Sequence, residues 1–231
     1  MKSEEIKYCI ESFNNKRKAN LRYTSFDYCF NYFQSFEDKK TITSNENLEL
    51  SCLQLGFYLA SWGMLRGSSE ALNHSVKWFA PVIEIISNSD RVLWTLDVDG
   101  YNEETLKVIN STYDQLAKAL NVKTHITLVT KIMLGVYGCV PAFDNNFTAW
   151  HRSIIKGKQT FTQKLDGIKK FYMDSNNKDT IDHYARSLKT IEFKTESSAN
   201  RCYTKAKIID MIGFEIGAKI NSKTTKPINI K

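Results

Sequence analysis

The chain has few of the residues that interrupt secondary structure. Its 231 residues include ten glycines and three prolines, Pro81, Pro141 and Pro227. Because proline and glycine mark most turns, this scarcity favours long helices over many short strands. A chain of this length can also bury a sizeable hydrophobic core. The composition therefore predicts a helical globular protein.

Several classes of protein are disfavoured by other absences. No apolar run approaches the ~18 residues that cross a bilayer, and the start of the chain has no apolar block typical of a secretory signal. The five cysteines form no CxxC or Cys/His cluster, the four histidines have no ligand spacing, and no P-loop or nucleophile-elbow motif occurs. We therefore expect no metal, cofactor, disulfide or membrane partner, and reduced thiols in a cytoplasmic protein.

Positive charge is concentrated in the last third of the chain. The whole sequence has a net charge of +7. Residues 1–150 hold 15 Lys and Arg against 17 Asp and Glu, whereas residues 151–231 hold 17 against 8, so the balances are −2 and +9. A basic segment suits a polyanionic partner, nucleic acid first. A lysine-rich solubilising surface explains the same count equally well.

Hydrophobic periodicity predicts helices along most of the chain. The clearest pattern is Leu48, Cys52, Leu55, Leu59 and Trp62, whose alternating steps of four and three follow one helix face. Comparable patterns predict helices within residues 4–18, 25–33, 103–120, 124–136, 161–172, 180–188 and 204–220. Loops are predicted at residues 37–47 and 174–179, and residues 190–201 are assigned to no element.

Two segments are ambiguous. Pro81 lies inside an apolar pattern over residues 72–83, which predicts a kink or a break there. The segment RVLWTLDVDGYN has strand-like composition, but no second strand is evident, so we expect a short helix and a turn. The overall prediction is one all-α domain, residues 1–222, with about eight to ten helices. Residues 223–231 are expected to form a disordered tail.

A first candidate site lies at the end of the helix that carries Trp62. Arg66 is followed by Ser68 and Ser69, so a cation and two hydroxyl groups meet exposed backbone N–H groups at a helix junction. Such a junction can hold a phosphate. The same residues also suit a plain turn between two helices.

A second candidate is the segment TKIMLGVYGCVPAFDNNF, residues 130–147. It combines a helical lysine, a glycine stop, a proline turn and an aspartate that opens the next helix. Two helices joined in this way can bring Lys131 and Asp144 to one cleft, as nucleophile and electrostatic partner. Tyr137 and Asn145 are candidate binding residues in the same segment. The alternative is a surface ion pair.

The order of these features resembles the core of the helix-hairpin-helix base-excision DNA glycosylase superfamily. The resemblance implies a helix-hairpin-helix fold, DNA as partner, Lys131 attacking the sugar C1′, and Asp144 stabilising the positive charge on the sugar. The residues before Lys131, NVKTHITLVT, lack the glycine-rich hairpin of that superfamily. The blocks SWGMLRGSS, TKIMLGVYGCVPAFDNNF and KIIDMIGFEIG are also similar to an uncharacterised family of bacterial proteins, which implies no activity.

Cations and aromatic residues alternate after residue 150. Arg152, Lys156 and Lys158 follow Trp150 and precede Phe161, a mixture that suits single strands or a displaced base. Alternatively, the aromatic rings belong to the core and the lysines face solvent.

We therefore expect a DNA-associated protein, with DNA favoured over RNA, that is distantly like these glycosylases and acts on a damaged or modified nucleotide. The alternative is a non-catalytic helical module that binds nucleic acid or a protein partner in a mobile-element or phage-defence system.

Overall fold

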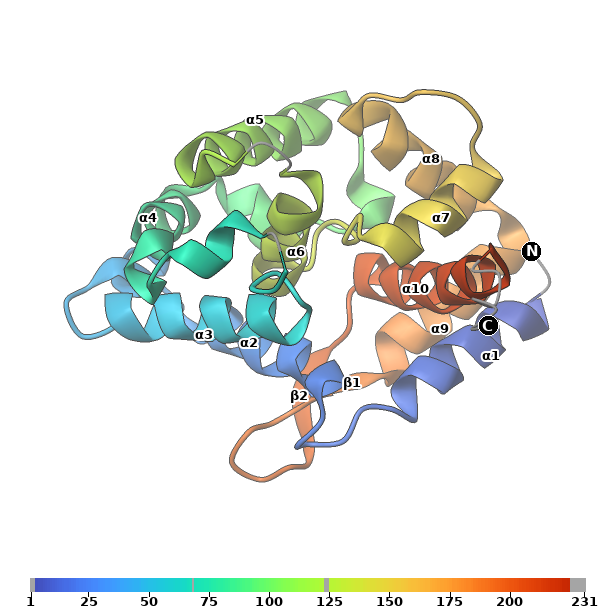
Figure 1. Ribbon diagram of the computed structural model, residues 1–231. Helices are drawn as coiled ribbons and strands as arrows, with labels where there is room; N and C mark the ends of the chain where they lie inside the picture. The colour runs from blue at the N-terminus through green and yellow to red at the C-terminus, as the bar shows by residue number, and fades with distance from the viewer. Residues whose placement is uncertain (1–2, 68, 123–124, 225–231) are drawn as a thin grey trace, which may run out of the picture.

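The computed structural model is an assembly of helices with one small hairpin (Figure 1). It describes residues 3–67, 69–122 and 125–224, which contain ten α-helices and two strands. The helices are α1 Ser3–Asn14, α2 Ser25–Ser35, α3 Leu48–Ser61, α4 Ala80–Asn88, α5 Glu103–Leu120, α6 Ile126–Tyr137, α7 Asn145–Ile154, α8 Phe161–Met173, α9 Ser175–Ser187 and α10 Lys205–Thr224. The strands are β1 Lys189–Ile191 and β2 Ser198–Cys202. The predicted all-α class is confirmed.

Local sequence sets the turn between α6 and α7. α6 ends at Tyr137 and is followed by Gly138, whose φ of +69° lies in the left-handed region that glycine adopts without strain. A Cβ at this position would also lie 2.9 Å from the ring of Phe30. α7 begins after Asp144, whose Oδ1 accepts a hydrogen bond from the Phe147 N–H at 2.9 Å. A glycine stop and an aspartate cap therefore fix the two ends of this turn.

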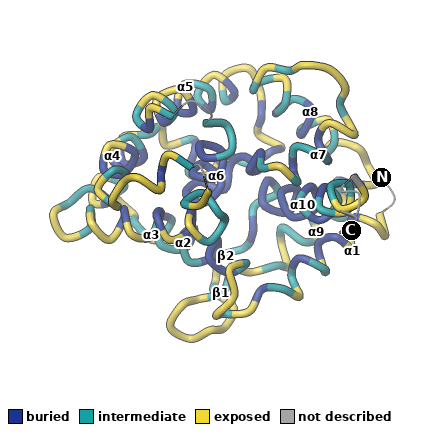
Figure 2. Tube along the Cα trace, viewed as in Figure 1, coloured by how far each residue is buried: buried dark blue, intermediate teal, exposed yellow. Residues whose placement is uncertain are grey.

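Helices α6 and α10 occupy the interior (Figure 2). Residues 128–137 of α6 and residues 206–213 of α10 are all buried. α7 packs along α10 so closely that a Cβ at Gly217 would lie 1.7 Å from the carbonyl oxygen of Asn146. The first turn of α7 is therefore held against α10.

The structure differs from the sequence prediction on both sides of α9. Strands β1 and β2 form an antiparallel hairpin in which Lys189 pairs with Cys202. Most of this hairpin lies within residues 190–201, which the sequence prediction assigns to no element. The loop predicted at residues 174–179 is wrong, because α9 begins at Ser175 and the Asp174 side chain accepts a hydrogen bond from the Asn176 N–H at 3.1 Å. The short polar residues that suggest a loop are also those that begin a helix.

The region around Pro81 divides into three short elements. Two 3₁₀ helices, Glu70–Asn73 and Val76–Phe79, precede α4. The predicted break is confirmed, and Pro81 lies in the first turn of α4, where its missing N–H loses no helical partner. The segment RVLWTLDVDGYN forms two further 3₁₀ helices, Arg91–Trp94 and Val98–Gly100, rather than a strand.

A buried ion pair connects the N-terminal part of the chain to the hairpin. Arg17 Nη2 lies 2.6 Å from Asp27 Oδ2, and the two side chains are only 3% and 0% exposed. The Ile191 N–H donates to the same oxygen at 2.8 Å, and the Tyr203 hydroxyl donates to the other one. Asp27 thus fixes β1 and the segment that leads into α10.

The end of α10 extends further than the sequence suggests. The helix runs to Thr224, so the first two residues of the predicted tail are helical, while residues 225–231 lie outside the described part of the chain. Within the described residues, no helix combines the length and apolar character needed to span a bilayer.

Candidate functional site

A cleft of about 860 Å³ opens where the end of α3, the start of α6, the start of α7 and α10 meet. We call it the central cleft, and its wall includes Arg22, Trp62, Arg66, Asp144, Asn145 and Phe214. Five of the predicted site residues, Trp62, Arg66, Ser69, Asp144 and Asn145, therefore lie around one hollow, although 83 positions separate the first from the last.

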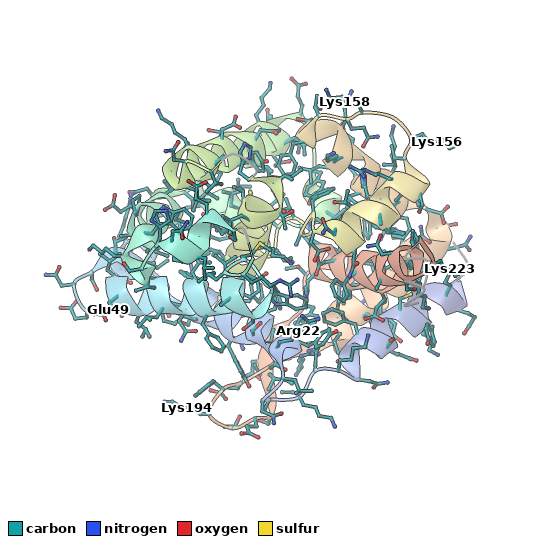
Figure 3. The ribbon with its side chains drawn as sticks, in the orientation of Figure 1. Arg22, Glu49, Lys156, Lys158, Lys194 and Lys223 are labelled. Atoms are coloured by element: carbon teal, nitrogen blue, oxygen red, sulfur yellow. The ribbon has the colours of Figure 1, made fainter. Side chains whose placement is uncertain are left out.

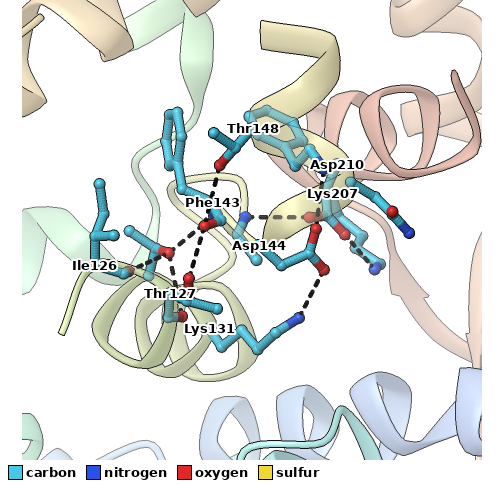
Figure 4. A network of polar contacts seen from close by, with 12 residues as sticks. Ile126, Thr127, Lys131, Phe143, Asp144, Thr148, Lys207 and Asp210 are labelled. Atoms are coloured by element: carbon cyan, nitrogen blue, oxygen red, sulfur yellow. Dashed lines mark hydrogen bonds and ion pairs between the residues drawn. The ribbon is translucent and has the colours of Figure 1, made fainter. Parts of the chain in front are cut away.

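Lys131 and Asp144 are in contact at the edge of this cleft (Figure 4). Lys131 Nζ lies 3.1 Å from Asp144 Oδ2, and the side chains are 4% and 17% exposed. Asp144 lines the cleft, whereas the Lys131 ammonium is enclosed between this carboxylate and the ring of Trp62, 4.9 Å from the ring centroid. The structure therefore brings the two predicted residues together but exposes only the carboxylate.

The Asp144 carboxylate is held at both of its oxygens. Oδ1 caps α7 through the Phe147 N–H, and Oδ2 contacts Lys131. The preceding residue is fixed as well, because the Phe143 N–H donates to Thr130 Oγ1 at 2.9 Å and Thr127 Oγ1 donates to the Phe143 carbonyl at 2.9 Å. Asp144 is thus a rigidly positioned acid, and Lys131 is the residue that orients it.

A second buried ion pair lies beside the first. Lys207 Nζ and Asp210 Oδ2 are 2.8 Å apart, with side chains 2% and 11% exposed. Asp210 Oδ1 accepts a hydrogen bond from the Ala142 N–H at 3.1 Å, which ties α10 to the turn before Asp144 (Figure 4). The sequence analysis missed this pair, whose signal is a lysine and an aspartate three positions apart on the last helix.

Trp62 is the aromatic wall of the central cleft. The Arg22 guanidinium lies over its ring, 5.5 Å from the centroid, and Phe214 packs edge-on at 5.7 Å. The indole Nε1 is buried and has no hydrogen-bond partner among the described residues. An indole N–H normally finds a partner when it is buried, so this donor is an unsatisfied group beside the cleft.

Arg66 and Ser69 have different environments although both line the cleft. Arg66 is exposed and has no ion-pair partner in the described chain. The Ser69 hydroxyl instead donates to the Met64 carbonyl and closes the turn. Ser68, the other predicted hydroxyl, lies outside the described residues. Arg66 is therefore the group at this junction that remains free to meet an anion.

The remaining predicted residues lie away from the central cleft. Tyr137 is 1% exposed and packs against Trp94 in the core, with a centroid distance of 4.9 Å, so it is not placed to bind a ligand there. Arg152 is exposed at the other end of α7. Lys156 and Lys158 lie on the connection from α7 to α8 (Figure 3).

Lys156 and Lys158 line a second hollow, of about 640 Å³, between the end of α7 and α8. We call it the lysine cleft, and its wall also includes Ile154, Asp166, Lys170, Phe171, Asp174 and Asn177. Asn177 is 2% exposed, its Nδ2 donates to the Phe171 carbonyl at 2.8 Å, and its Oδ1 has no partner within the described residues. The wall thus combines cations, one aromatic ring and an unpaired buried acceptor.

Buried His151 lies on α7 between the two clefts. It is 3% exposed, packs on Phe143 and Phe147, and its Nε2 lies 3.4 Å from the Lys164 carbonyl oxygen. Burial lowers the pKa of His151, because an imidazolium ion loses hydration there. The folded protein therefore holds a neutral imidazole under conditions in which the unfolded chain already binds a proton.

This shift predicts an acid sensitivity. With a folded-state pKa below the unfolded value of 6.5, stability is lost as the pH falls below about 6.5, by at most ~1.4 kcal/mol per pH unit for one proton. Urea denaturation between pH 7.5 and 5 should show this loss in the wild type and a shallower one in His151→Leu. Parallel curves for the two proteins would contradict the assignment.

Several residues of the site carry no signal in the sequence. Arg22 lies in a segment between α1 and α2 that belongs to no motif, and Asn146 reaches the cleft because α7 packs on α10. Phe214 belongs to the block KIIDMIGFEIG, where helix packing accounts for an apolar residue equally well. These three residues were missed because only the tertiary arrangement brings them together.

Neither a metal site nor a similarity to known proteins indicates a function for this chain. Among the described residues, no group of histidine, cysteine and acidic side chains could hold a metal ion. No protein-family model, curated protein or solved structure matches the chain. The function therefore has to be inferred from the geometry of the two clefts.

Proposed function

We propose that the protein binds DNA and that the central cleft holds one nucleotide of the bound strand. The observation that carries this proposal is the meeting, at one open cleft, of the Arg22 guanidinium, which lies over the Trp62 ring, and the unpaired Arg66. Guanidinium groups match phosphate oxygens in geometry and charge. Bases stack on indole rings and on guanidinium planes.

The polar groups of the cleft suit the rest of a nucleotide. Asp144 and Asn145 offer acceptors and an amide to a base edge or a sugar hydroxyl, and the charge of Asp144 is balanced by Lys131 rather than left open. Within this proposal, any chemistry on the nucleotide is carried out at the Asp144 carboxylate, which faces the cleft. Lys131 acts as a positioning residue.

Binding of single-stranded DNA should be salt-sensitive and should depend on Arg66. We expect Arg66→Ala to weaken binding of a fluorescently labelled oligonucleotide and to reduce the slope of log affinity against log salt by about 0.7, the value for one phosphate contact. Fluorescence anisotropy between ~50 and ~200 mM salt measures both quantities.

The matched control is Arg91→Ala, which removes an exposed arginine from the 3₁₀ helix Arg91–Trp94. It should leave affinity and slope close to those of the wild type. Wild-type protein that does not bind at ~50 mM salt, or binds without salt dependence, would rule out the proposal and favour a protein-binding module. An RNA oligonucleotide of the same sequence tests the preference for DNA.

A further inference from the structure

The lysine cleft carries positive charge that the protein does not neutralise. Lys156, Lys158 and Lys170 have no ion-pair partner among the described residues, and their charge exceeds that of Asp166 and Asp174 in the same wall. Arg152 on α7 and Lys164 on α8 are two further cations on the helices that border this cleft. Burial lowers the pKa of Lys164, and the neighbouring Arg152 cation lowers it further. An anion bound by the cleft lysines would offset their excess positive charge.

The solvent-facing side of α7 connects the lysine cleft to the central cleft. Its core face is formed by Phe147, Trp150 and His151, all buried. Asn145 at the start of the helix and Arg152 near its end are exposed on the opposite side, seven positions or two turns apart. Asn145 lines the central cleft, and residues shortly after Arg152 line the lysine cleft.

Both ends of this route offer a surface on which a base can stack. In the central cleft this surface is the exposed Arg22 guanidinium, which lies over the Trp62 ring, and in the lysine cleft it is the half-buried Phe171. Bases reach such rings only when they are not stacked within a duplex. The ten residues of α7 span about 15 Å, or roughly four phosphates at the ~3.4 Å spacing of one strand of DNA.

We propose that the lysine cleft is a second subsite for the same strand, so that single-stranded nucleic acid runs along α7 from the central cleft to Lys156, Lys158 and Lys170. This inference rests on the proposed function of the central cleft. The lysines bind phosphates, Phe171 supports a base, and Asn177 Oδ1 is the one buried acceptor in the wall that lacks a donor among the described groups. A free nucleotide presents the same phosphate and base chemistry as a strand. The two kinds of ligand are distinguished by whether affinity rises with the length of the ligand.

The test compares ligand lengths. Thymidine monophosphate and labelled oligothymidylates of two, four and eight nucleotides are titrated into full-length wild type, into the triple variant Lys156→Ala/Lys158→Ala/Lys170→Ala, and into a control triple variant. The control, Lys7→Ala/Lys77→Ala/Lys118→Ala, removes three exposed lysines from other parts of the surface. Circular dichroism melting of each variant establishes that the fold is retained.

The wild type and the control should bind the eight-nucleotide strand at least tenfold more tightly than the dinucleotide. The lysine-cleft variant should lose this gain and reduce the salt slope for the eight-nucleotide strand by about 2, at ~0.7 per contact. Its affinity for the dinucleotide should stay close to the wild-type value.

Equal length dependence in all three proteins would overturn the second subsite while leaving the central cleft intact. If the lysine-cleft variant loses binding of thymidine monophosphate, and longer strands bind the wild type no more tightly than the monophosphate does, the lysine cleft is a site for a free nucleotide. That result would overturn the proposed path of a strand along α7. Failure of the wild type to bind any of these ligands would overturn the proposed function as well.

Discussion

Asp27→Ala is expected to lower the free energy of unfolding by about 3–5 kcal/mol, because it leaves the guanidinium of Arg17 buried without a counter-ion. The same change removes the acceptor of the Ile191 N–H, one of the contacts that hold β1, and of the Tyr203 hydroxyl just after β2. For a chain of this size, the melting temperature should fall by roughly 6–20 °C. Urea denaturation and thermal melting measure the two quantities.

Two further variants separate the ion pair from other effects. Asp179→Ala removes an exposed carboxylate from α9 and should change stability by less than about 0.5 kcal/mol. The double variant Arg17→Met/Asp27→Leu removes both buried charges and should be more stable than Asp27→Ala alone. If Asp27→Ala were as stable as Asp179→Ala, the pair would not anchor the hairpin.

Lys131→Met is expected to destabilise the protein by about 3 kcal/mol and to leave any covalent trapping on DNA unchanged. The variant keeps an apolar side chain in α6 but removes the partner of the Asp144 carboxylate, which is only 17% exposed. A nucleophilic amine would have to leave this carboxylate and the Trp62 ring before it could attack a sugar. The structure therefore predicts a positioning role, unlike the nucleophilic role implied by the resemblance to glycosylases.

Two measurements test this role. Borohydride reduction in the presence of abasic DNA should give no adduct that depends on Lys131, and loss of an adduct in Lys131→Met would restore the nucleophilic assignment. Lys107→Met serves as the stability control, because Lys107 and Glu103 form an exposed pair, 72% and 84% accessible, of the kind that contributes at most about 1 kcal/mol. A drop in stability for Lys107→Met as large as that for Lys131→Met would show that the burial of the pair does not matter.

Much of the fold could be read from local sequence. The apolar stripe from Leu48 to Trp62 predicts α3, and the glycine and aspartate that flank Pro141 predict the ends of α6 and α7. The hairpin at 189–202 could not be predicted in this way. Its residues are polar, and the main-chain groups of β1 bond to Asp27 and Asn31, far away in the sequence. A strand stabilised by distant partners leaves little periodicity in its own residues.

The candidate site shows the same division. The sequence by itself determined that Lys131 and Asp144 lie on two helices joined by a tight turn, because glycine, proline and a capping carboxylate act over a few residues. Only the tertiary structure decided which of the two side chains faces the cleft. The packing of α3 and α10 places Trp62 over the Lys131 amine and leaves the Asp144 carboxylate, 17% exposed, in the wall of the cleft. It also brings Arg22 to Trp62, since long-range contacts depend on how helices pack and not on the spacing of residues along the chain.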